Sequence, residues 1–319
     1  EDVTDPDYRE ENWTNIKAML KGRADSYRMI NQYVHADGHK IWGDHSVSCI
    51  RDEDGGVENF LIQVTDITPV ERELRERLEF EEFVWGAITS GHLVAYAQPI
   101  VDARTGRLVE EELLVRIVRP DGQVMVPDEF LPQARRFGMM PTIDRFMVAR
   151  AVELAGAGRR VAVNLSAASI NDAATLAAII EELRDAGEVA ARVSFEITEH
   201  TALGSTDLAE RFSEGMRRLG CRLALDDFGT GFGSFTELRG MTLHKLKIDQ
   251  GFVTNLTRNP HDEAAVRAIV AIAAEFGLLT TAEGVEDTAT RNRLIELGVD
   301  QLQGYLIGRP APAATTGNR

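Results

Sequence analysis

Two adjacent carboxylates, Asp226 and Asp227, follow the short apolar run Leu223–Leu225 and precede three glycines within six residues. Glycine adopts backbone angles closed to other residues, so the stretch from Asp227 to Phe235 is predicted to be a tight loop after a strand. Two neighbouring carboxylates repel each other unless a cation lies between them. An isolated Asp-Asp pair is more often a solvated turn, so a metal site is indicated only if other strands end in similar side chains.

Other strand-like runs do carry such side chains. Four runs alternate between bulky apolar residues on one face and small or polar residues on the other: Val161–Leu165, Val193–Ile197, Leu223–Asp226 and Leu246–Ile248. Their polar faces carry Asn164, Glu196, Asp226 and Lys247. If the bulky faces pack outward against helices, these four side chains point inward near the carboxyl ends of the strands, where barrel enzymes place their chemistry. Burying several ionisable groups without a ligand is costly, so we predict a functional site rather than a polar core.

Earlier and later strands add to the same predicted site. Two strand-like runs flank a hairpin-like turn at residues 102–107, and Glu112 and Arg116 lie on one face of the second run. Glu112 could bind a metal ion, while the guanidinium of Arg116 could donate two parallel hydrogen bonds to a phosphate. Two later runs supply Glu283 and Gln303. Carboxylate and amide oxygens without cysteine or histidine favour Mg²⁺ or Mn²⁺, and a pair of such ions suits in-line attack of water on phosphorus.

Composition narrows the class of protein. The chain has 319 residues, is 44% hydrophobic and carries a formal net charge of −16. This acidity argues against nonspecific binding to nucleic acid, so bound cations would have to attract an anionic substrate. No apolar run reaches the roughly 18 residues that a membrane span needs. The two cysteines lie far apart, which favours a reduced, cytoplasmic setting, and the first residue, Glu1, predicts a fragment of a longer protein.

The large domain is predicted to be an α/β barrel. Strand-like and helical patterns alternate from about residue 80 onward, as expected of β/α units, with helices predicted at 143–155, 174–185 and 262–276. The length suits a TIM-like (β/α)8 barrel, which typically takes about 250 residues. We assign residues 92–311 to this barrel, with an antiparallel first strand, and residues 312–319 to a tail.

Residues 1–67 form a separate module of the α+β type. A helix at 7–20 precedes three strand-like runs, and Asp-Gly pairs separate the runs, which is a strong hairpin signal. This pattern resembles the C-terminal half of a PAS sensor domain, and the matching residues are Tyr27-Arg28-Met29, His35-Ala-Asp-Gly38, Trp42 and Asp66-Ile-Thr68. The opening strands and ligand-pocket helices of that family have no counterpart, so a haem or flavin site would be incomplete. His35, His39 and His45 are therefore interpreted as surface residues of strands and turns.

A helix linking the two parts is predicted over residues 68–91. Thr68 can cap its first turn, Pro69 fits the first helical position, and Glu71 can complete a capping box. An apolar line follows at Val70, Leu74 and Leu78. Two interpretations are open: an amphipathic linker packed on its own barrel, or a short parallel coiled coil that carries a signal between domains.

The motifs of the large domain, taken together and in order, resemble those of the EAL-domain cyclic di-GMP phosphodiesterases, which act in bacterial signal transduction. The matching segments are Gln98-Pro-Ile-Val101, Glu112-Leu-Leu-Val-Arg116, Asn164-Leu-Ser166, Glu196-Ile-Thr-Glu199, Asp226-Asp-Phe-Gly-Thr-Gly231, Leu246-Lys-Ile-Asp249, Glu283-Gly-Val-Glu286 and Gln303-Gly-Tyr305. They cover the whole domain. No GGDEF-type cyclase motif occurs, so synthesis of the dinucleotide is not expected.

The resemblance implies two Mg²⁺ or Mn²⁺ ions per active site, with Asp226 shared between them. The first ion would be bound by Glu112, Asn164, Glu196 and Asp226. The second would be bound by Asp226, Asp227 and Glu283. The cyclic dinucleotide would be hydrolysed to linear pGpG, which carries a 5′-phosphate.

The resemblance also implies roles for the residues around these ions. Lys247 would hold the attacking water or hydroxide, and Gln303 would form hydrogen bonds in the same site, so that Lys247, Glu112, Glu283 and Gln303 form the catalytic set. Arg116 would grip a phosphate oxygen, and Gln98 and Asp249 would also contact substrate. Glu199 would brace the Asp227–Phe235 loop.

Three departures from the family pattern bear on function. Leu113 and Ile117 replace the usual alanine and tryptophan but lie on the outward face, so they are expected to change packing and to have little effect on the chemistry. Arg135 stands where the family's Phe-Ile-Pro-x-Ala-Glu segment has glutamate. If that position helps to hold a guanine, substrate affinity would change.

We therefore predict a PAS-regulated cyclic di-GMP phosphodiesterase. The alternative is a catalytically silent receptor that binds the same dinucleotide and transmits a conformational signal, and the loss of a metal ligand would favour it. A third possibility, another metal-dependent barrel hydrolase, would require the acids but not Arg116 or Gln303. A homodimer is also expected, because Phe232 and Phe235 are large apolar residues beside the glycine-rich loop, a region that lies at a dimer contact in the family.

Overall fold

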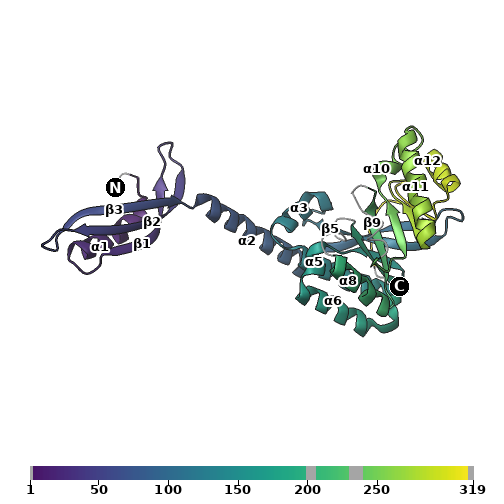
Figure 1. Cartoon of the computed structure of the whole chain (residues 1–319), viewed down its shortest axis with the longest axis horizontal. Coiled ribbons are helices and arrows are strands. Elements are labelled where there is room, and N and C mark those ends of the chain that lie inside the picture. The colour runs from purple at the N-terminus through teal and green to yellow at the C-terminus, as the bar shows by residue number, and fades with distance from the viewer. Residues whose placement is uncertain (1–2, 199–205, 230–239, 315–319) are drawn as a thin grey trace. The chain divides into compact units, whose positions relative to one another are not determined.

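The structure is a computed structural model that describes residues 3–198, 206–229 and 240–314. The chain divides into two compact units, Glu1–Glu82 and Phe83–Arg319, and each is considered by itself. Figure 1 shows the smaller unit in purple and blue and the larger unit in teal, green and yellow.

The N-terminal unit contains the predicted helix and the three predicted strands. Helix α1 (Pro6–Leu20) packs on an antiparallel sheet of β1 (Ser26–Val34), β2 (Lys40–Arg51) and β3 (Val57–Asp66) in the order β1-β2-β3. The Asp-Gly pairs form the turns as predicted, because Gly38 and Gly55 adopt φ values of 92° and 81°, which favour glycine. The assignment of this unit to the PAS family stays a prediction.

His45 is buried, so the prediction that all three histidines of this unit lie on the surface was wrong for it. Its side chain is on the inner face of β2 and is only 2% exposed, and its Nδ1 lies 2.8 Å from the hydroxyl of Tyr33. Burial lowers the pKa of His45. His35 and His39 are exposed, as predicted.

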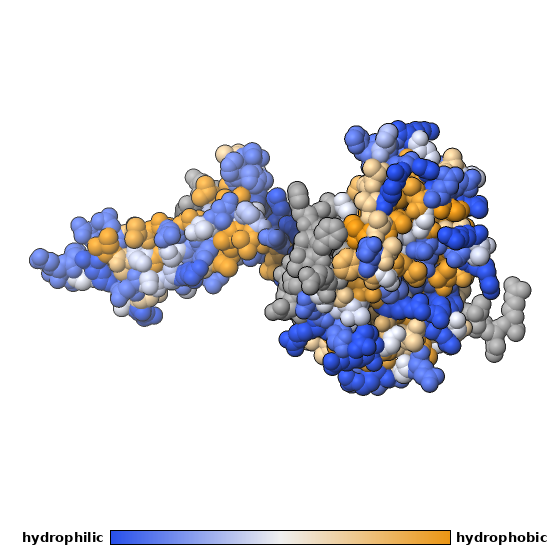
Figure 2. All heavy atoms as spheres, turned by 45° about the vertical axis from the view of Figure 1, so that its right-hand side comes forward, coloured by the Kyte–Doolittle hydropathy of each residue, from blue (hydrophilic) through white to orange (hydrophobic). Residues whose placement is uncertain are grey.

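Strand β3 leaves apolar side chains in contact with solvent. Leu61 and Ile62 are neighbours in the strand and so point to opposite faces of the sheet, yet they are 65% and 59% exposed. Apolar surface is visible on this unit in Figure 2. The helix α2 (Thr68–Thr89) begins at the predicted residue, and the hydroxyl of Thr68 accepts a hydrogen bond of 2.7 Å from the Trp42 amide. Its apolar line is exposed at Val70, Leu74 and Leu78. Both interpretations of that line stay predictions.

The larger unit is a closed β/α barrel, as predicted. Its eight strands, in ring order, are β4 (Leu93–Asp102), β5 (Leu108–Val118), β7 (Val161–Asn164), β8 (Val193–Thr198), β9 (Arg222–Phe228), β10 (Lys245–Ile248), β11 (Leu279–Ala282) and β12 (Gln301–Gln303). β4 pairs with both β5 and β12 and thereby closes the ring. It runs antiparallel to both neighbours, whereas the other pairs in the ring are parallel. The short strands β6 (Val124–Met125) and β13 (Ala311–Pro312) attach outside the ring.

Helices cover the outside of this ring. They are α3 (Pro127–Arg136), α4 (Met140–Gly156), α5 (Ala167–Asn171), α6 (Ala173–Ala186), the 3₁₀ helix η1 (Gly187–Arg192), α8 (Thr206–Arg218), α10 (Gln250–Val253), α11 (Pro260–Phe276) and α12 (Thr288–Leu297). In Figure 1, α6 and α8 lie on one side of the barrel, and α11 and α12 lie on the other. Among the described residues, no helix is long and apolar enough to cross a membrane.

The bulky faces of the strands pack outward against these helices, as the alternation predicts. Ile248 and Ala282, for example, are buried in one cluster with Val266 and Ile269 of α11 and with Leu294 of α12. Burying each of the larger aliphatic side chains, such as Ile248 or Leu294, contributes about 1.5–3 kcal/mol. Because this packing fixes the direction of one face of every strand, the other face must point into the barrel.

Candidate active site

Lys247 lies at the centre of the predicted site. Its side chain is 1% exposed, and its Nζ lies 2.5 Å from Glu196, 2.5 Å from Glu283, 3.2 Å from Asp226 and 3.5 Å from Glu112. These acids come from β5, β8, β9 and the residue that follows β11. The parallel strands end at one rim of the barrel, which explains how residues far apart in sequence meet around one ammonium group.

Side-chain amides complete the hydrogen bonds of Glu112. Gln303 donates to its Oε2 at 2.6 Å, and Asn164 donates to its Oε1 at 2.7 Å. Gln98, which stands opposite Glu112 on β4, accepts a hydrogen bond of 3.3 Å from Gln303 and donates one of 3.1 Å to the Gly308 carbonyl. Both carboxylate oxygens of Glu112 are therefore held in fixed positions.

A bulge in β9 sets the position of the paired aspartates. The sequence predicts a loop from Asp227 onward, but the strand continues to Phe228. Leu246 and Ile248 of β10 are two residues apart, yet their partners Leu225 and Phe228 are three apart, so β9 holds one extra residue. Asp227 has φ 55°, a left-handed conformation that is uncommon outside glycine. In a regular strand the two carboxylates would point to opposite faces, whereas the bulge allows both to reach the same rim.

The buried charges in this group shift one another's pKa values. Burial, together with the neighbouring carboxylates, raises the pKa of Glu196 well above its usual range and that of Glu283 to about 8. Burial also acts to raise the pKa of Glu112, but the nearby Lys247 ammonium and the amide hydrogen bonds outweigh it and lower that pKa. The surrounding carboxylates raise the pKa of Lys247 despite its burial, so the lysine is a stable cation.

The acidic group has the composition and spacing of a cation site. One oxygen each of Asp226, Asp227 and Glu283 lie within 4.8 Å of one another. Within the described ranges, Oε1 of Glu196 and Oδ1 of Asp226 are buried and make no hydrogen bond, although the Lys247 ammonium lies 3.2 Å from the Asp226 oxygen. Buried carboxylate oxygens need a partner, and oxygen ligands suit hard divalent cations. These residues therefore fit the metal ions that the sequence predicts.

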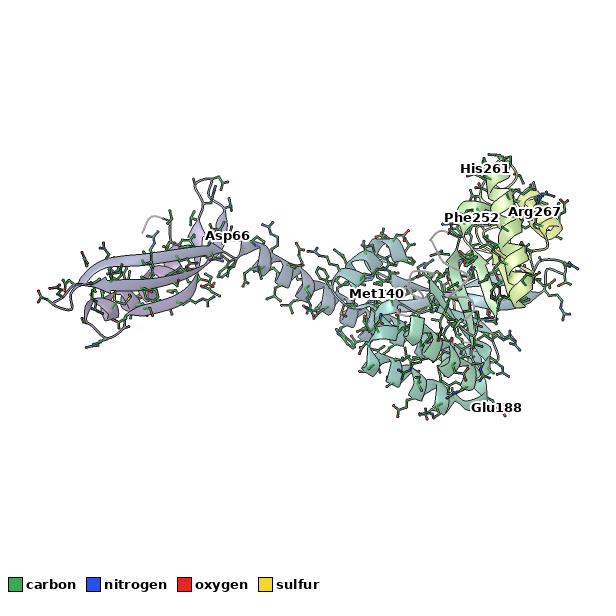
Figure 3. The ribbon with its side chains drawn as sticks, viewed as in Figure 1. Asp66, Met140, Glu188, Phe252, His261 and Arg267 are labelled. Carbon is green, nitrogen blue, oxygen red and sulfur yellow. The ribbon has the colours of Figure 1, made fainter. Side chains whose placement is uncertain are left out.

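A cleft of about 540 Å³ opens beside this group. Asn164, Glu196 and the two aspartates line one part of it, and residues of β5, α3 and α4 line much of the rest, among them Leu131, Arg135 and Met140. Met140 marks the start of α4 in Figure 3. The cleft thus joins the acids to a partly apolar wall.

The rim beside Asn164 is held by a carboxylate that the sequence reasoning missed. Asp144 of α4 is buried and accepts hydrogen bonds from the amide of Ser166 at 2.9 Å, from its hydroxyl at 2.5 Å, and from the hydroxyl of Ser169 at 2.6 Å. It thereby holds the segment just after Asn164. Its position in a predicted helix gave no signal of this contact, which depends on how α4 packs against α5.

Of the remaining predicted residues, Arg116 and Asp249 make contacts of their own, and Glu199 is not described. Arg116 is buried on β5, donates to the Val115 carbonyl at 2.8 Å, and lies over the ring of Tyr96. Asp249 caps α10 by accepting a hydrogen bond of 2.9 Å from the Gly251 amide. Glu199 lies outside the described residues, as does the segment 230–239, so the bracing of the loop stays a prediction.

A second buried ion pair lies one layer below the site. Lys245 and Glu110 are 1% and 5% exposed and contact each other, and Ser194 donates to Glu110 at 3.0 Å. Lys245 lies two residues before Lys247, and Glu110 lies two residues before Glu112. The period of two residues in a strand would have placed them on the inward face, so the signal was present in the sequence.

The fold and this group define a β/α-barrel protein with an acidic, lysine-centred site at the carboxyl ends of its strands. The EAL domain family profile matches residues 84–310, and the chain belongs to this family. The cyclic di-GMP phosphodiesterase PdeF of Escherichia coli is 32% identical over 255 residues, which cover 78% of this chain and 34% of PdeF. The cyclic di-GMP phosphodiesterase PdeB of Shewanella oneidensis is 34% identical over 236 residues, covering 72% and 28%.

Solved structures share the barrel. The PaMucR phosphodiesterase in complex with c-di-GMP is 32% identical with a TM-score of 0.69, covering 74% of this chain and 98% of that one. The FimX EAL domain of Pseudomonas aeruginosa bound to c-di-GMP is 26% identical with a TM-score of 0.68, covering 75% and 98%. The chain spans about a third of the length of the curated relatives it matches.

Proposed function

We propose that residues 92–311 form a metal-dependent phosphodiesterase that hydrolyses cyclic di-GMP to linear pGpG. The observation that carries this proposal is the convergence of four carboxylates on the buried ammonium of Lys247, next to an open cleft. A receptor would need contacts to phosphate and guanine only. The two named relatives, both cyclic di-GMP phosphodiesterases, support the choice of substrate.

Two hard divalent cations, Mg²⁺ or Mn²⁺, would complete the site. Glu112, Asn164, Glu196 and Asp226 would hold one ion, and Asp226, Asp227 and Glu283 would hold the other. When bound, such a pair activates water and stabilises the charge that develops on the phosphodiester oxygens. Attack of water on phosphorus forms one P–O bond and breaks the bond to the 3′ oxygen, which leaves a 5′-phosphate and a 3′-hydroxyl.

The chain's own residues orient and stabilise this step. Lys247 is cationic and rigidly surrounded, so its ammonium would donate hydrogen bonds to the attacking water and stabilise negative charge mainly in the transition state. Gln303 holds Glu112 in place through its 2.6 Å hydrogen bond. Both effects need rigid geometry, which the buried strand positions supply.

Substrate contacts would come from the residues around the rim. Arg116 would bind a phosphate oxygen by a charge-assisted hydrogen bond, and Gln98 and Asp249 are proposed as further contacts. A guanine base would lie in the cleft between the acids and α3, where Arg135 is a lining residue. Arginine can donate to a base edge or stack on it but cannot accept a hydrogen bond, so it would hold the base differently from a glutamate.

Three further proposals concern regulation, assembly and setting. Residues 1–67 are proposed to be part of a PAS sensor, joined to the barrel by the helical linker at 68–91. A homodimer is proposed from the family resemblance, although Phe232 and Phe235 lie outside the described residues. A reduced, cytoplasmic compartment is proposed from the sequence, in which the two cysteines, Cys49 and Cys221, lie far apart.

Incubation of the chain with cyclic di-GMP and Mg²⁺, followed by chromatography, tests the activity. We expect linear pGpG, no product after exhaustive chelation, and recovery with Mg²⁺ or Mn²⁺ but little with Ca²⁺, which prefers longer bonds and looser coordination. Lys247→Ala should keep substantial binding and lose hydrolysis. Tight binding without product in the wild-type chain, with either metal, would favour the receptor instead. Repeating the assay without residues 1–67 separates an inhibited enzyme from an inactive site.

A further inference from the structure

A second cluster of side chains that could act as metal ligands lies in the N-terminal unit, at the turn between β1 and β2. His35 and His39 are directly opposed across this turn, because the His35 amide donates to the His39 carbonyl at 2.8 Å. The Gly38 amide donates to the His35 carbonyl at 2.9 Å, and Gly38 has φ 92°. Opposed residues of a hairpin point to the same face. The turn therefore brings the two imidazoles together by backbone geometry alone.

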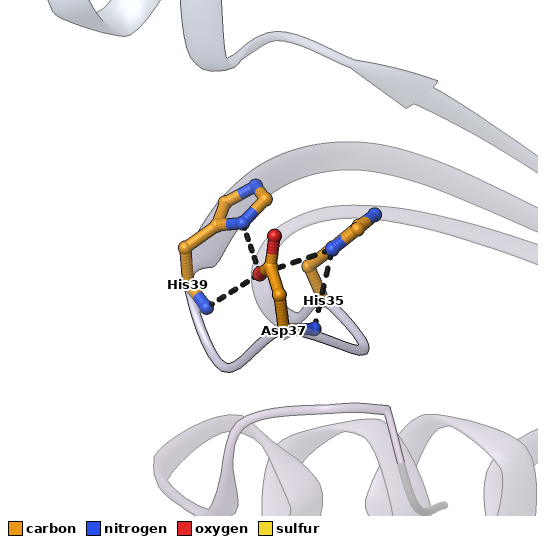
Figure 4. A group of neighbouring side chains, drawn as sticks. All are labelled: His35, Asp37 and His39. Carbon is orange, nitrogen blue, oxygen red and sulfur yellow. Dashed lines mark hydrogen bonds and ion pairs between the residues drawn. The ribbon is translucent and has the colours of Figure 1, made fainter.

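The three side chains converge on one point, as Figure 4 shows. The imidazole rings are stacked, with centroids 4.5 Å apart and planes inclined by 27°. Each Nδ1 approaches the same oxygen, Oδ1 of Asp37, at 3.1 Å for His35 and closer for His39. One ligand atom from each of the three residues fits within a span of 4.8 Å. Bound metal ions hold nitrogen and oxygen ligands at about 2.0–2.2 Å, so small side-chain rotations would suffice.

The turn itself requires fewer polar side chains than this. Two side-chain contacts cap the turn: the His39 amide donates to Asp37 Oδ1 at 3.1 Å, and the Asp37 amide donates to His35 Nδ1 at 3.5 Å. The His39 imidazole takes no part in capping the turn, and both imidazoles are exposed, so burial does not explain their arrangement. The adjacent cation, Lys40, pairs with Asp5 at 2.7 Å and does not neutralise Asp37.

We propose that His35, Asp37 and His39 bind a divalent transition metal ion of the Zn²⁺ class, with the remaining coordination position open to water. Two imidazole nitrogens and one carboxylate oxygen are typical ligands of such ions, and three protein ligands plus water form an open zinc site. The barrel group differs because all its donors are oxygens. The two sites should therefore select different metals in the same chain.

Copper(II) is a suitable spectroscopic probe of this site, because coordinated imidazole nitrogens split its electron paramagnetic resonance lines. The full chain, without a polyhistidine tag, is titrated with up to one equivalent of Cu²⁺ in excess Mg²⁺, which occupies oxygen sites. We expect splitting from two nitrogens. His39→Gln should leave one nitrogen and bind at least tenfold more weakly. Zn²⁺ added to the wild type should remove the copper signal by competition.

The matched control is His261→Gln. His261 is also exposed and lies at the start of α11, as Figure 3 shows, and it belongs to no group of possible metal ligands among the described residues, so its replacement should leave the copper spectrum unchanged. Asp37→Asn keeps an oxygen for the turn but loses the charge, and it should weaken binding without changing the number of nitrogens. Unchanged thermal unfolding of each variant excludes a folding defect.

Two results would overturn the proposal. One is a wild-type spectrum without nitrogen splitting. The other is two-nitrogen splitting that persists in the double variant His35→Gln/His39→Gln, which would place the copper on other histidines. The outcome does not depend on cyclic di-GMP hydrolysis, because no step of the measurement uses the barrel site.

Discussion

Replacing Lys245 by methionine tests whether the second ion pair stabilises the barrel through its charges. Lys245 and Glu110 are 1% and 5% exposed, so the substitution leaves the Glu110 carboxylate buried without its cation. Breaking a buried pair in this way costs about 3–5 kcal/mol. For a domain of this size, about 1 kcal/mol shifts the melting temperature by roughly 2–4 °C. The barrel of Lys245→Met should therefore melt roughly 6–20 °C lower by differential scanning calorimetry.

Removing the partner as well should reverse most of this loss. The double variant Lys245→Met/Glu110→Leu has no buried charge and keeps a similar volume, and such replacements are often neutral or stabilising. Ser194 loses its acceptor, which costs about 1 kcal/mol. The matched control is Arg217→Met, which breaks an exposed pair with Glu214 and should cost less than about 1 kcal/mol.

The reasoning fails if the double variant melts as low as Lys245→Met. The loss would then not come from the uncompensated charge of Glu110, since methionine keeps most of the apolar volume of the lysine stem. The double variant also tests the site above it. Because Glu112 and Lys247 keep their own contacts, Mn²⁺ affinity should stay within a few fold of the wild type by calorimetric titration.

Three other predictions follow from the site and the barrel. Asp227→Gly and Asp227→Ala should lose turnover alike, but the alanine variant should be about 1 kcal/mol less stable, because residue 227 has φ 55°; equal melting temperatures would contradict this. Arg135→Glu should change KM for cyclic di-GMP much more than kcat if the cleft holds a base, and steady-state kinetics measures both. Burial lowers the pKa of His244 to about 4, so the barrel should lose stability as pH falls from about 6.5 towards 4, because the unfolded chain then binds the proton more strongly. His244→Gln should flatten that part of the stability curve, and a parallel fall in the variant would contradict the assignment.

The alternation of residue types determined much of the barrel and of its candidate site. Val161, Val163 and Phe195 could only be buried against helices, and this fixed the inward direction of Asn164 and Glu196. Residues far apart in the chain could therefore be assigned to one rim from the alternation of their strands alone. The same rule applied to Glu110 and Lys245 would have found the lower ion pair, since each lies two residues from a predicted site residue.

Tertiary structure alone decided the features that break the regular period. The extra residue in β9 depends on how that strand pairs with β10, and it brings Asp226 and Asp227 to one rim. The burial of His45 depends on what covers its face of the small sheet, because the alternation of a strand does not say which face is covered. The hydrogen bond from the Ser166 amide to Asp144 depends on the packing of α4. Local sequence specifies which way a side chain points along its own strand, whereas contacts between strands and helices specify what that side chain meets.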